Sequence, residues 1–103
     1  MTEFDNVSIV KEANIYFEGQ VISHTVKFSD GTIKTLGVML PGEYEFSTQK
    51  KEQMEILNGE LDVLLPRQSN WVRIVEGETF DVPATSTFNV RIHQITDYCC
   101  SYE

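Results

Sequence analysis

The chain has 103 residues, with 16 acidic side chains against 8 Lys and Arg side chains, which gives a formal net charge of −8. This length predicts one domain, residues 1–103, with a single core. The acidic balance argues against a nucleic-acid partner, because contacts with phosphates need clustered cations, and no apolar run approaches the ~20 residues of a membrane span.

The first segment, residues 1–13, has early acids and lacks the apolar stretch of a secretory signal. We therefore expect a cytoplasmic protein with at most a loose arm or a helical turn here. Beyond it, short stretches rich in Val, Ile, Phe, Tyr and Thr alternate with turn residues, as in an all-β sandwich or barrel. "HTVKFSDGTIKTLGVML" predicts two strands joined by a tight turn at Asp30-Gly31. "EILNGELDVLL" predicts a second hairpin with Asn58-Gly59 at its tip, because glycine tolerates the positive φ of such turns.

Alternation along the strands predicts which side chains face inward. In "GEYEFST", residues 42–48, the acids Glu43 and Glu45 belong in solvent, so the opposite face points into the core. The residues of that inner face are Tyr44, Phe46 and Thr48. The same rule predicts further inward side chains in later segments, namely Met54, Ile56, Phe80, Val82, Phe88, Val90 and Ile92. Arg91 alternates with two of these and is expected to point outward.

Two adjacent cysteines, Cys99 and Cys100, lie in the last predicted strand. Neighbouring residues of a strand point to opposite faces, so the pair neither closes an ordinary disulfide nor forms a metal-binding pair. We expect two reduced thiols, as in cytosolic proteins. A nucleophilic or redox role needs a base beside one thiol, and the sequence offers no candidate for that base.

Two spacings resemble the motifs of the cupin superfamily. Glu52 and Gly59 fit the Glu-x6-Gly end of its first motif, and Gly77 and Pro83 fit the Gly-x5-Pro start of its second. The longer stretches "GVMLPGEYEFSTQKKEQMEILNGELDVLLP", "GETFDVPATSTFNV" and "YCCSY" are similar to the small single-domain cupins of the pyrimidine/purine nucleoside phosphorylase family. The resemblance covers the chain from about residue 14 to the end. It implies an all-β fold, a cupin-type β-barrel built as a jelly-roll-like double sheet.

The metal ligands of the cupin motifs are missing from this sequence. The first motif ordinarily supplies two His and a Glu, and the second supplies another His. Here the two His places fall near Thr48 and Lys50, with a register open by a residue or two, and Phe88 takes the last ligand place. Only Glu52 remains, and one carboxylate does not hold a transition metal. We therefore expect no metal and no cofactor, and the resemblance implies inorganic phosphate as a co-substrate.

The resemblance implies phosphorolysis of purine and pyrimidine nucleosides to free base and pentose 1-phosphate. Glu52 is the expected catalytic residue, either holding sugar hydroxyls or, with a pKa raised by burial, donating a proton to the leaving base. An apolar slot suits either kind of base, because stacking tolerates base identity. The expected substrate-binding residues are Tyr44, Phe46, Thr48, Met54, Phe88 and Tyr98, and Tyr102 is a further hydrogen-bond donor. The candidate phosphate ligands are Lys34, Lys50 and Arg91.

Other interpretations stay open at this point. The aromatic residues at strand spacing also suit a plain core, Glu52 also suits a solvated loop, and Tyr98 also suits a barrel cap or a subunit contact. The same cavity would serve a non-catalytic module that binds a nucleoside or base. A metal-dependent cupin enzyme is the third reading, which Phe88 argues against. A homodimer is expected for each of them, because a barrel of this size exposes edge strands.

Overall fold

The computed structural model describes residues 3–103, and over this range it contains two antiparallel sheets and one short 3-10 helix. The large sheet consists of β1 (Ser8–Ile9), β2 (Asn14–Tyr16), β3 (Val21–Lys27), β4 (Ile33–Met39), β6 (Glu52–Asn58), β9 (Thr79–Val82) and β11 (Thr96–Tyr102). The small sheet consists of β5 (Gly42–Ser47), β7 (Glu60–Leu64), β8 (Val72–Val75) and β10 (Thr87–Ile92). The helical turn η1 (Phe17–Gly19) follows β2. None of the described residues forms a helix long and apolar enough to cross a membrane.

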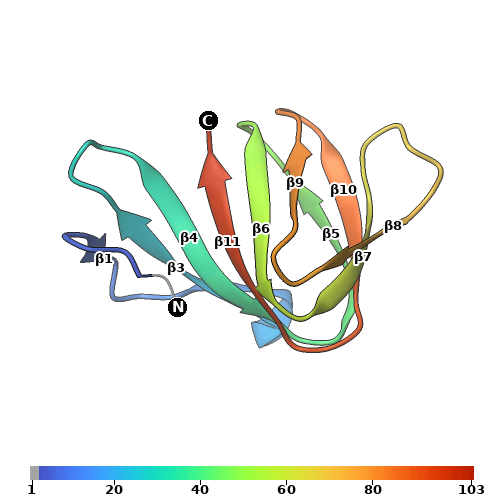
Figure 1. Cartoon of the computed structure of the whole chain (residues 1–103), viewed down its shortest axis with the longest axis horizontal. Coiled ribbons are helices and arrows are strands. Elements are labelled where there is room, and N and C mark those ends of the chain that lie inside the picture. The colour runs from blue at the N-terminus through green and yellow to red at the C-terminus, as the bar shows by residue number, and fades with distance from the viewer. Residues whose placement is uncertain (1–2) are drawn as a thin grey trace.

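The strand order confirms the predicted all-β double sheet. The large sheet runs β1-β3-β4-β11-β6-β9, with β2 also paired to β3, and the small sheet runs β5-β10-β7-β8. Figure 1 shows the large sheet passing from β3 through β4, β11 and β6 to β9, with β5, β10 and β7 beyond it. From β4 onward, every connection except β7–β8 crosses from one sheet to the other. This crossing places the two sheets face to face, with their inner faces forming the core.

The alternation rule identified the inner faces correctly. Ile56, Val82 and Val90 are almost fully buried, and Tyr44 and Thr48 are also buried in the same core. Glu43 and Glu45 are exposed on the opposite face of β5. Burial of such apolar side chains contributes roughly 25 cal/mol per Å² removed from water, so this face of each strand decides the register.

The hairpin expected at Asp30-Gly31 is confirmed. β3 and β4 pair in antiparallel register from Val21 opposite Met39 to Lys27 opposite Ile33. In the connection, the Asp30 carboxylate accepts hydrogen bonds from the backbone N–H and the hydroxyl of Thr32, at 2.9 and 2.7 Å. This local cap stabilises the turn that the two residues predicted.

The second expected hairpin, at Asn58-Gly59, is wrong. β6 pairs with β11 and β9, whereas β7 pairs with β10 and β8, so the two strands belong to different sheets. Gly59 has φ = 109° and turns the chain from the large sheet into the small one. The positive φ predicted for a hairpin is therefore present, but it serves a corner between sheets. Sequence spacing alone does not separate these two uses of an Asn-Gly pair.

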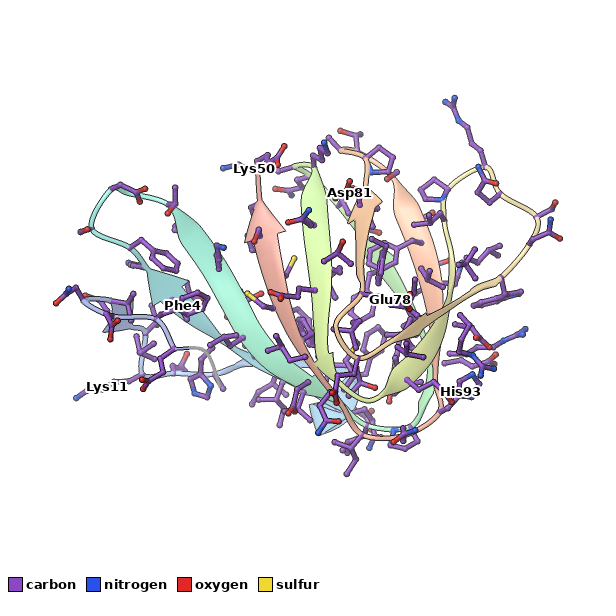
Figure 2. The ribbon with its side chains drawn as sticks, viewed as in Figure 1. Phe4, Lys11, Lys50, Glu78, Asp81 and His93 are labelled. Atoms are coloured by element: carbon purple, nitrogen blue, oxygen red, sulfur yellow. The ribbon has the colours of Figure 1, made fainter. Side chains whose placement is uncertain are left out.

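The N-terminal segment is more ordered than the loose arm expected for it. β1 pairs with β3, and the Phe4 ring packs edge-on against Phe28 at a centroid distance of 5.0 Å. Figure 2 shows Phe4 at this end of the sheet. The Lys34 ammonium lies 5.6 Å from the Phe4 ring. A strand pairing and an aromatic contact thus hold this segment against the β3–β4 end of the large sheet. Residues 1–2 of the expected arm lie outside the described residues.

Candidate active site

A cavity of about 120 Å³ lies between the two sheets, on the inner face of the large one. Side chains from both sheets line it: Tyr16, Ser23, Thr35, Met39, Phe46, Ser47, Glu52, Met54, Phe88, Tyr98, Cys100 and Tyr102. The large sheet contributes a wall of hydroxyl, thiol and carboxyl groups, and the small sheet contributes Phe46 and Phe88 opposite. The exposed fraction of Tyr16 is 48%, and Phe46 is half-buried, so these two rings mark the mouth.

The aromatic wall is a run of packed rings. Phe46 stacks on Phe88 with centroids 5.5 Å apart and an interplanar angle of 26°. Phe88 in turn meets Phe80 edge-on at 6.2 Å. Phe17, from the turn after β2, packs edge-on against Phe46 at 5.4 Å. The contacts with Phe17 and Phe88 fix the Phe46 ring as a flat apolar surface at the cavity.

The polar wall begins with Tyr98, which depends on a glycine. Ser23, Gly37 and Tyr98 are aligned across β3, β4 and β11. The tyrosine ring and its hydroxyl lie over Gly37, which pairs with Ser23 on its other side. Burial raises the pKa of Tyr98 to about 12, so its hydroxyl keeps its proton at neutral pH. Tyr98 is therefore a fixed hydrogen-bond donor in the cavity.

We predict that Gly37→Ala displaces Tyr98 and destabilises the fold. A Cβ at this position would lie 2.7 Å from the tyrosine hydroxyl oxygen and 2.6 Å from the backbone oxygen of Ile22. The backbone oxygen has little freedom to move, so we expect a loss of roughly 1–3 kcal/mol, as for overpacking elsewhere. Denaturant unfolding measures it, with Val38→Ala on the outer face as the control. A Gly37→Ala protein as stable as the wild type would contradict the close approach.

Glu52 lies at the other end of the polar wall, beside Cys100 and Tyr102. The Cys100 thiol donates a hydrogen bond to Oε1 of Glu52 at 3.5 Å, and Tyr102 is the cross-strand partner of Glu52. The Tyr102 hydroxyl also shares a hydrogen bond with Thr35 at 3.2 Å. Burial raises the pKa of Glu52, and the thiol hydrogen bond opposes part of that rise. Glu52 is the one charged group among the lining residues of the described chain.

No candidate base beside either thiol was evident from the sequence, but the structure brings the Glu52 carboxyl next to Cys100. The thiol is nevertheless inert, because burial and the neighbouring carboxylate raise the pKa of Cys100 to about 12. Both cysteines are free, as expected, and both are also buried. Cys100 therefore acts here as a neutral donor and not as a nucleophile.

The cavity brings together most of the residues that the sequence predicted for the site. Its lining includes Glu52, Phe46, Met54, Phe88 and Tyr98, together with Tyr102. Two predicted substrate-binding residues, Tyr44 and Thr48, do not line it. The Tyr44 hydroxyl donates to the backbone oxygen of Leu40 at 2.7 Å, and the Thr48 hydroxyl donates to that of Pro83 at 2.7 Å. Both hydroxyls thus satisfy buried backbone groups, although both side chains face inward as predicted.

The three predicted phosphate ligands lie elsewhere. Lys34 covers the Phe4 and Phe28 rings, and Lys50 lies exposed in the β5–β6 connection (Figure 2). Arg91 points outward, as its alternation predicted, where it pairs with Glu43 at 2.6 Å and stacks on the Trp71 ring at 3.9 Å. None of these cations is among the residues that line the cavity.

Several lining residues were missed by the sequence reasoning. They are Tyr16, Ser23, Thr35, Met39, Ser47 and Cys100. Ser23 and Thr35 are polar, so alternation of apolar and polar side chains gave no signal for them. Cys100 had a signal, because "YCCSY" places Tyr98, Cys100 and Tyr102 at a spacing of two, on one face of a strand.

The residues present do not fit a metal centre. Of the two places expected for His ligands, Thr48 is buried just after the end of β5 and Lys50 is exposed in the connection to β6. Phe88 is buried opposite. Within residues 3–103, no group of three or more His, Cys, Asp or Glu side chains lies close enough to hold a metal ion. Of the places expected for metal ligands, Phe88 offers only an apolar ring, and the Thr48 hydroxyl already donates to the backbone oxygen of Pro83.

The arrangement of the two sheets is similar to that of cupin domains. The cupin domain of Schizosaccharomyces pombe Cnp3 superposes with a TM-score of 0.62 at 14% identity, over 82% of this chain and 66% of that one. A crystal structure from Acinetobacter sp. ADP1 superposes with a TM-score of 0.96 at 42% identity, over 98% of each chain. The chain therefore has a cupin-like fold, in which two facing sheets, and not the closed barrel that was predicted, enclose a cavity.

The family follows from the sequence comparisons. The model of the pyrimidine/purine nucleoside phosphorylase family matches residues 11–102. A relative in Geobacter sulfurreducens, named pyrimidine/purine nucleoside phosphorylase, is 58% identical over 102 residues, covering 99% of this chain and 98% of the relative. The chain belongs to the pyrimidine/purine nucleoside phosphorylase family.

Proposed function

We propose that the protein catalyses the phosphorolysis of purine and pyrimidine nucleosides, which yields free base and pentose 1-phosphate. The observation that carries this proposal is the two-sided cavity of a family member: a stacked aromatic wall faces hydroxyl donors and one protonatable carboxyl. An aromatic surface suits a base, and hydroxyl and carboxyl groups suit a sugar and a phosphate.

The size of the cavity determines how a nucleoside fits. Its volume of about 120 Å³ is below the roughly 300 Å³ at which ligand pockets usually begin. The sugar and its glycosidic bond therefore occupy the interior, beside Glu52, and the base lies toward the mouth against Phe46. A base at the mouth is not enclosed on its edges, which explains how one site accepts both the larger purines and the smaller pyrimidines.

The reaction needs one proton and one nucleophile. An oxygen of phosphate forms a bond to C1′ of the sugar while the bond from C1′ to the base nitrogen breaks. The electron pair of that bond passes to the base, and Glu52 donates its proton to the base nitrogen. Burial raises the pKa of Glu52, which favours the protonated form that this step consumes. Deprotonated Glu52 then faces the positive charge that develops on the sugar.

Phosphate is held in this proposal by neutral donors. The cavity wall carries the hydroxyls of Ser23, Thr35, Tyr98 and Tyr102. A buried cation would favour the ionised form of Glu52. Neutral hydroxyl donors leave that carboxyl able to keep its proton. The proposed reaction uses no metal, and the aromatic and hydroxyl side chains at the ligand positions support this.

Base stacking on Phe46 is tested by Phe46→Ala. We expect kcat/KM to fall roughly 5- to 150-fold, mainly through KM, which corresponds to the ~1–3 kcal/mol of base–aromatic stacking. Steady-state kinetics with inosine and uridine measure it. The matched control is Phe28→Ala, because Phe28 packs on Phe4 away from the cavity. Equal kinetics in the two variants would remove Phe46 from the substrate site.

The activity itself is tested with purified protein and five nucleosides: uridine, thymidine, adenosine, inosine and guanosine. Each is incubated with and without phosphate, and with a chelator, while chromatography follows free base. We expect base release that requires phosphate and withstands the chelator. Release without phosphate would indicate a hydrolase. Binding without release from any nucleoside would leave a non-catalytic binding module.

The proposal also includes a cytoplasmic homodimer. Free thiols at both cysteines suit a reducing compartment. Among residues 3–103, β9 is an edge strand of the large sheet, and β5 and β8 are the edge strands of the small one. Such edges favour pairing with a second copy. Light scattering after size-exclusion chromatography gives the mass: a dimer supports the proposal and a monomer overturns it.

A further inference from the structure

A thiol lies beside the proposed catalytic acid, on the same wall of the cavity. Cys100 is opposite Met54 in the β6–β11 pairing, and Tyr102 is opposite Glu52. Sγ of Cys100 lies 3.5 Å from Oε1 of Glu52, and both residues line the cavity. The exposed fraction of Cys100 is 3%, whereas Glu52 is half-buried. A buried strand position of this kind is filled as readily by Val or Ser, which raises the question of what the thiol does.

We propose that Cys100 is a positioning residue for Glu52: its thiol holds one carboxyl oxygen in place and, as a weak donor, leaves the carboxyl able to keep a proton. The inference rests on the proposed function, in which protonated Glu52 is the acid. It goes further, because it states that the protonation of Glu52 is controlled by Cys100, a neighbour that does not touch the reacting atoms.

Hydrogen-bond chemistry indicates which oxygen of Glu52 carries the proton and how the donor at position 100 affects the pKa of Glu52. A donor on Oε1 requires an acceptor there, so the proton of the neutral carboxyl resides on Oε2. A hydroxyl in place of the thiol would be a stronger donor and would favour the carboxylate. Removal of the donor would favour the neutral carboxyl. The thiol stays protonated throughout, since burial and the charge of Glu52 hold the pKa of Cys100 near 12.

The other groups near Glu52 do not duplicate this contact. Among the described residues, β11 supplies the titratable neighbours, which are Cys100, Tyr98 and Tyr102. On β9, the residue opposite Glu52 is Val82, which does not titrate. Across the cavity the small sheet presents Phe46, Ser47 and Phe88. The preceding Lys51 is half exposed and pairs with Glu103 at 3.7 Å.

Two substitutions at one position test the inference, because they act in opposite directions. Cys100→Ser strengthens the donor and is expected to lower the pKa of Glu52 by roughly half a pH unit or more, and Cys100→Ala is expected to raise it. The carboxyl carbon of Glu52 reports this pKa by NMR in protein labelled with ¹³C-glutamate, and the signal missing from Glu52→Gln assigns it. Cys99→Ser, one residue away on the opposite face of β11, is the control and should leave the titration unchanged.

The same variants are assayed for base release between pH 5 and 9. Protonated Glu52 is lost as pH rises through its pKa, so the alkaline limb should move down in Cys100→Ser and up in Cys100→Ala. Phosphate also titrates in this range, but equally for every variant. Shifts of the NMR titration in one common direction, or none, would overturn the inference. Opposite NMR shifts with an unmoved activity profile would support the role of Cys100 and instead overturn Glu52 as the acid.

Discussion

Glu52→Gln is expected to lower phosphate-dependent base release by roughly 10²–10⁴-fold, the range that a positioned acid contributes. Glutamine has nearly the same shape, so the contact with Cys100 is retained. Its amide does not give up a proton to the base, and it offers no negative charge to the developing cation. We expect the loss in kcat, because the proton moves only in the transition state. Steady-state rates of base release measure it for each nucleoside.

Glu55→Gln is the matched control for this variant. Glu55 lies on the same strand, β6, but it is exposed on the outer face. It should retain wild-type rates, while a loss in both variants would point to the strand and not to the site. Retention of full activity in Glu52→Gln would remove the acid role from Glu52 even if the protein proves to be a phosphorylase.

The pH dependence of stability separates a folding defect from a chemical one. Burial raises the pKa of Glu52 above its value in the unfolded chain, so its contribution to stability is complete at low pH and is lost as pH rises through the folded pKa. Glu52→Gln lacks this titration. Its melting temperature relative to the wild type should therefore improve with rising pH, which calorimetry at pH 5 and pH 8 would show. An inactive variant that is also less stable at pH 8 would indicate a damaged fold.

The aromatic half of the site was predictable from the sequence, and the polar half was only partly predictable. Phe46 and Phe88 are apolar residues that alternate with polar ones, so burial alone assigns them inward. Ser23 and Thr35 line the same cavity from β3 and β4. The alternation rule assigns polar side chains to solvent, so it does not predict polar side chains that line an internal cavity. The polar wall therefore required the three-dimensional arrangement of strands far apart in the chain.

Hydrogen bonding explains the two residues that faced inward without reaching the cavity. Tyr44 lies on the predicted face of β5 and Thr48 directly follows that strand, but each has a hydroxyl that must be satisfied when buried. Nearby backbone oxygens, from Leu40 and Pro83, accept those bonds. A strand face is a property of the local sequence, whereas the partner of a buried hydroxyl depends on which loop folds over it. Sequence alternation predicts the first and not the second.

The fold shows the same limit at Gly59. The pair Asn58-Gly59 predicted a positive φ, and Gly59 has one, at 109°. Whether the chain then returns along its own sheet or enters the other depends on the neighbours of each strand. β6 is enclosed by β11 and β9, so no edge of β6 is left for β7. Strand order of this kind is set by pairings across much of the chain, and two turn residues carry no information about it.

Gly59→Ala is expected to destabilise the protein by roughly 3–4 kcal/mol, more than any other substitution considered above. Backbone strain for a residue with a side chain in this region accounts for ~1–3 kcal/mol, and overpacking adds ~1–3 kcal/mol. A Cβ here would lie 2.7 Å from Cα of Thr96 and 2.8 Å from the backbone oxygen of Ile95, and it would also clash with the Thr96 hydroxyl. These are atoms of the chain entering β11, which carries Tyr98 and Cys100. Chemical denaturation measures the loss.

Gly77→Ala separates the two causes. Gly77 also has a positive φ, of 90°, but a Cβ there would meet nothing within 4 Å. It should therefore show only the strain of the backbone, and the difference between the two variants measures the close approach of Gly59 to β11. Equal losses would mean that the corner has room for a side chain. A larger loss at Gly59, accompanied by weaker base release in the fraction that remains folded, would show that this corner also fixes the strand that carries the polar wall.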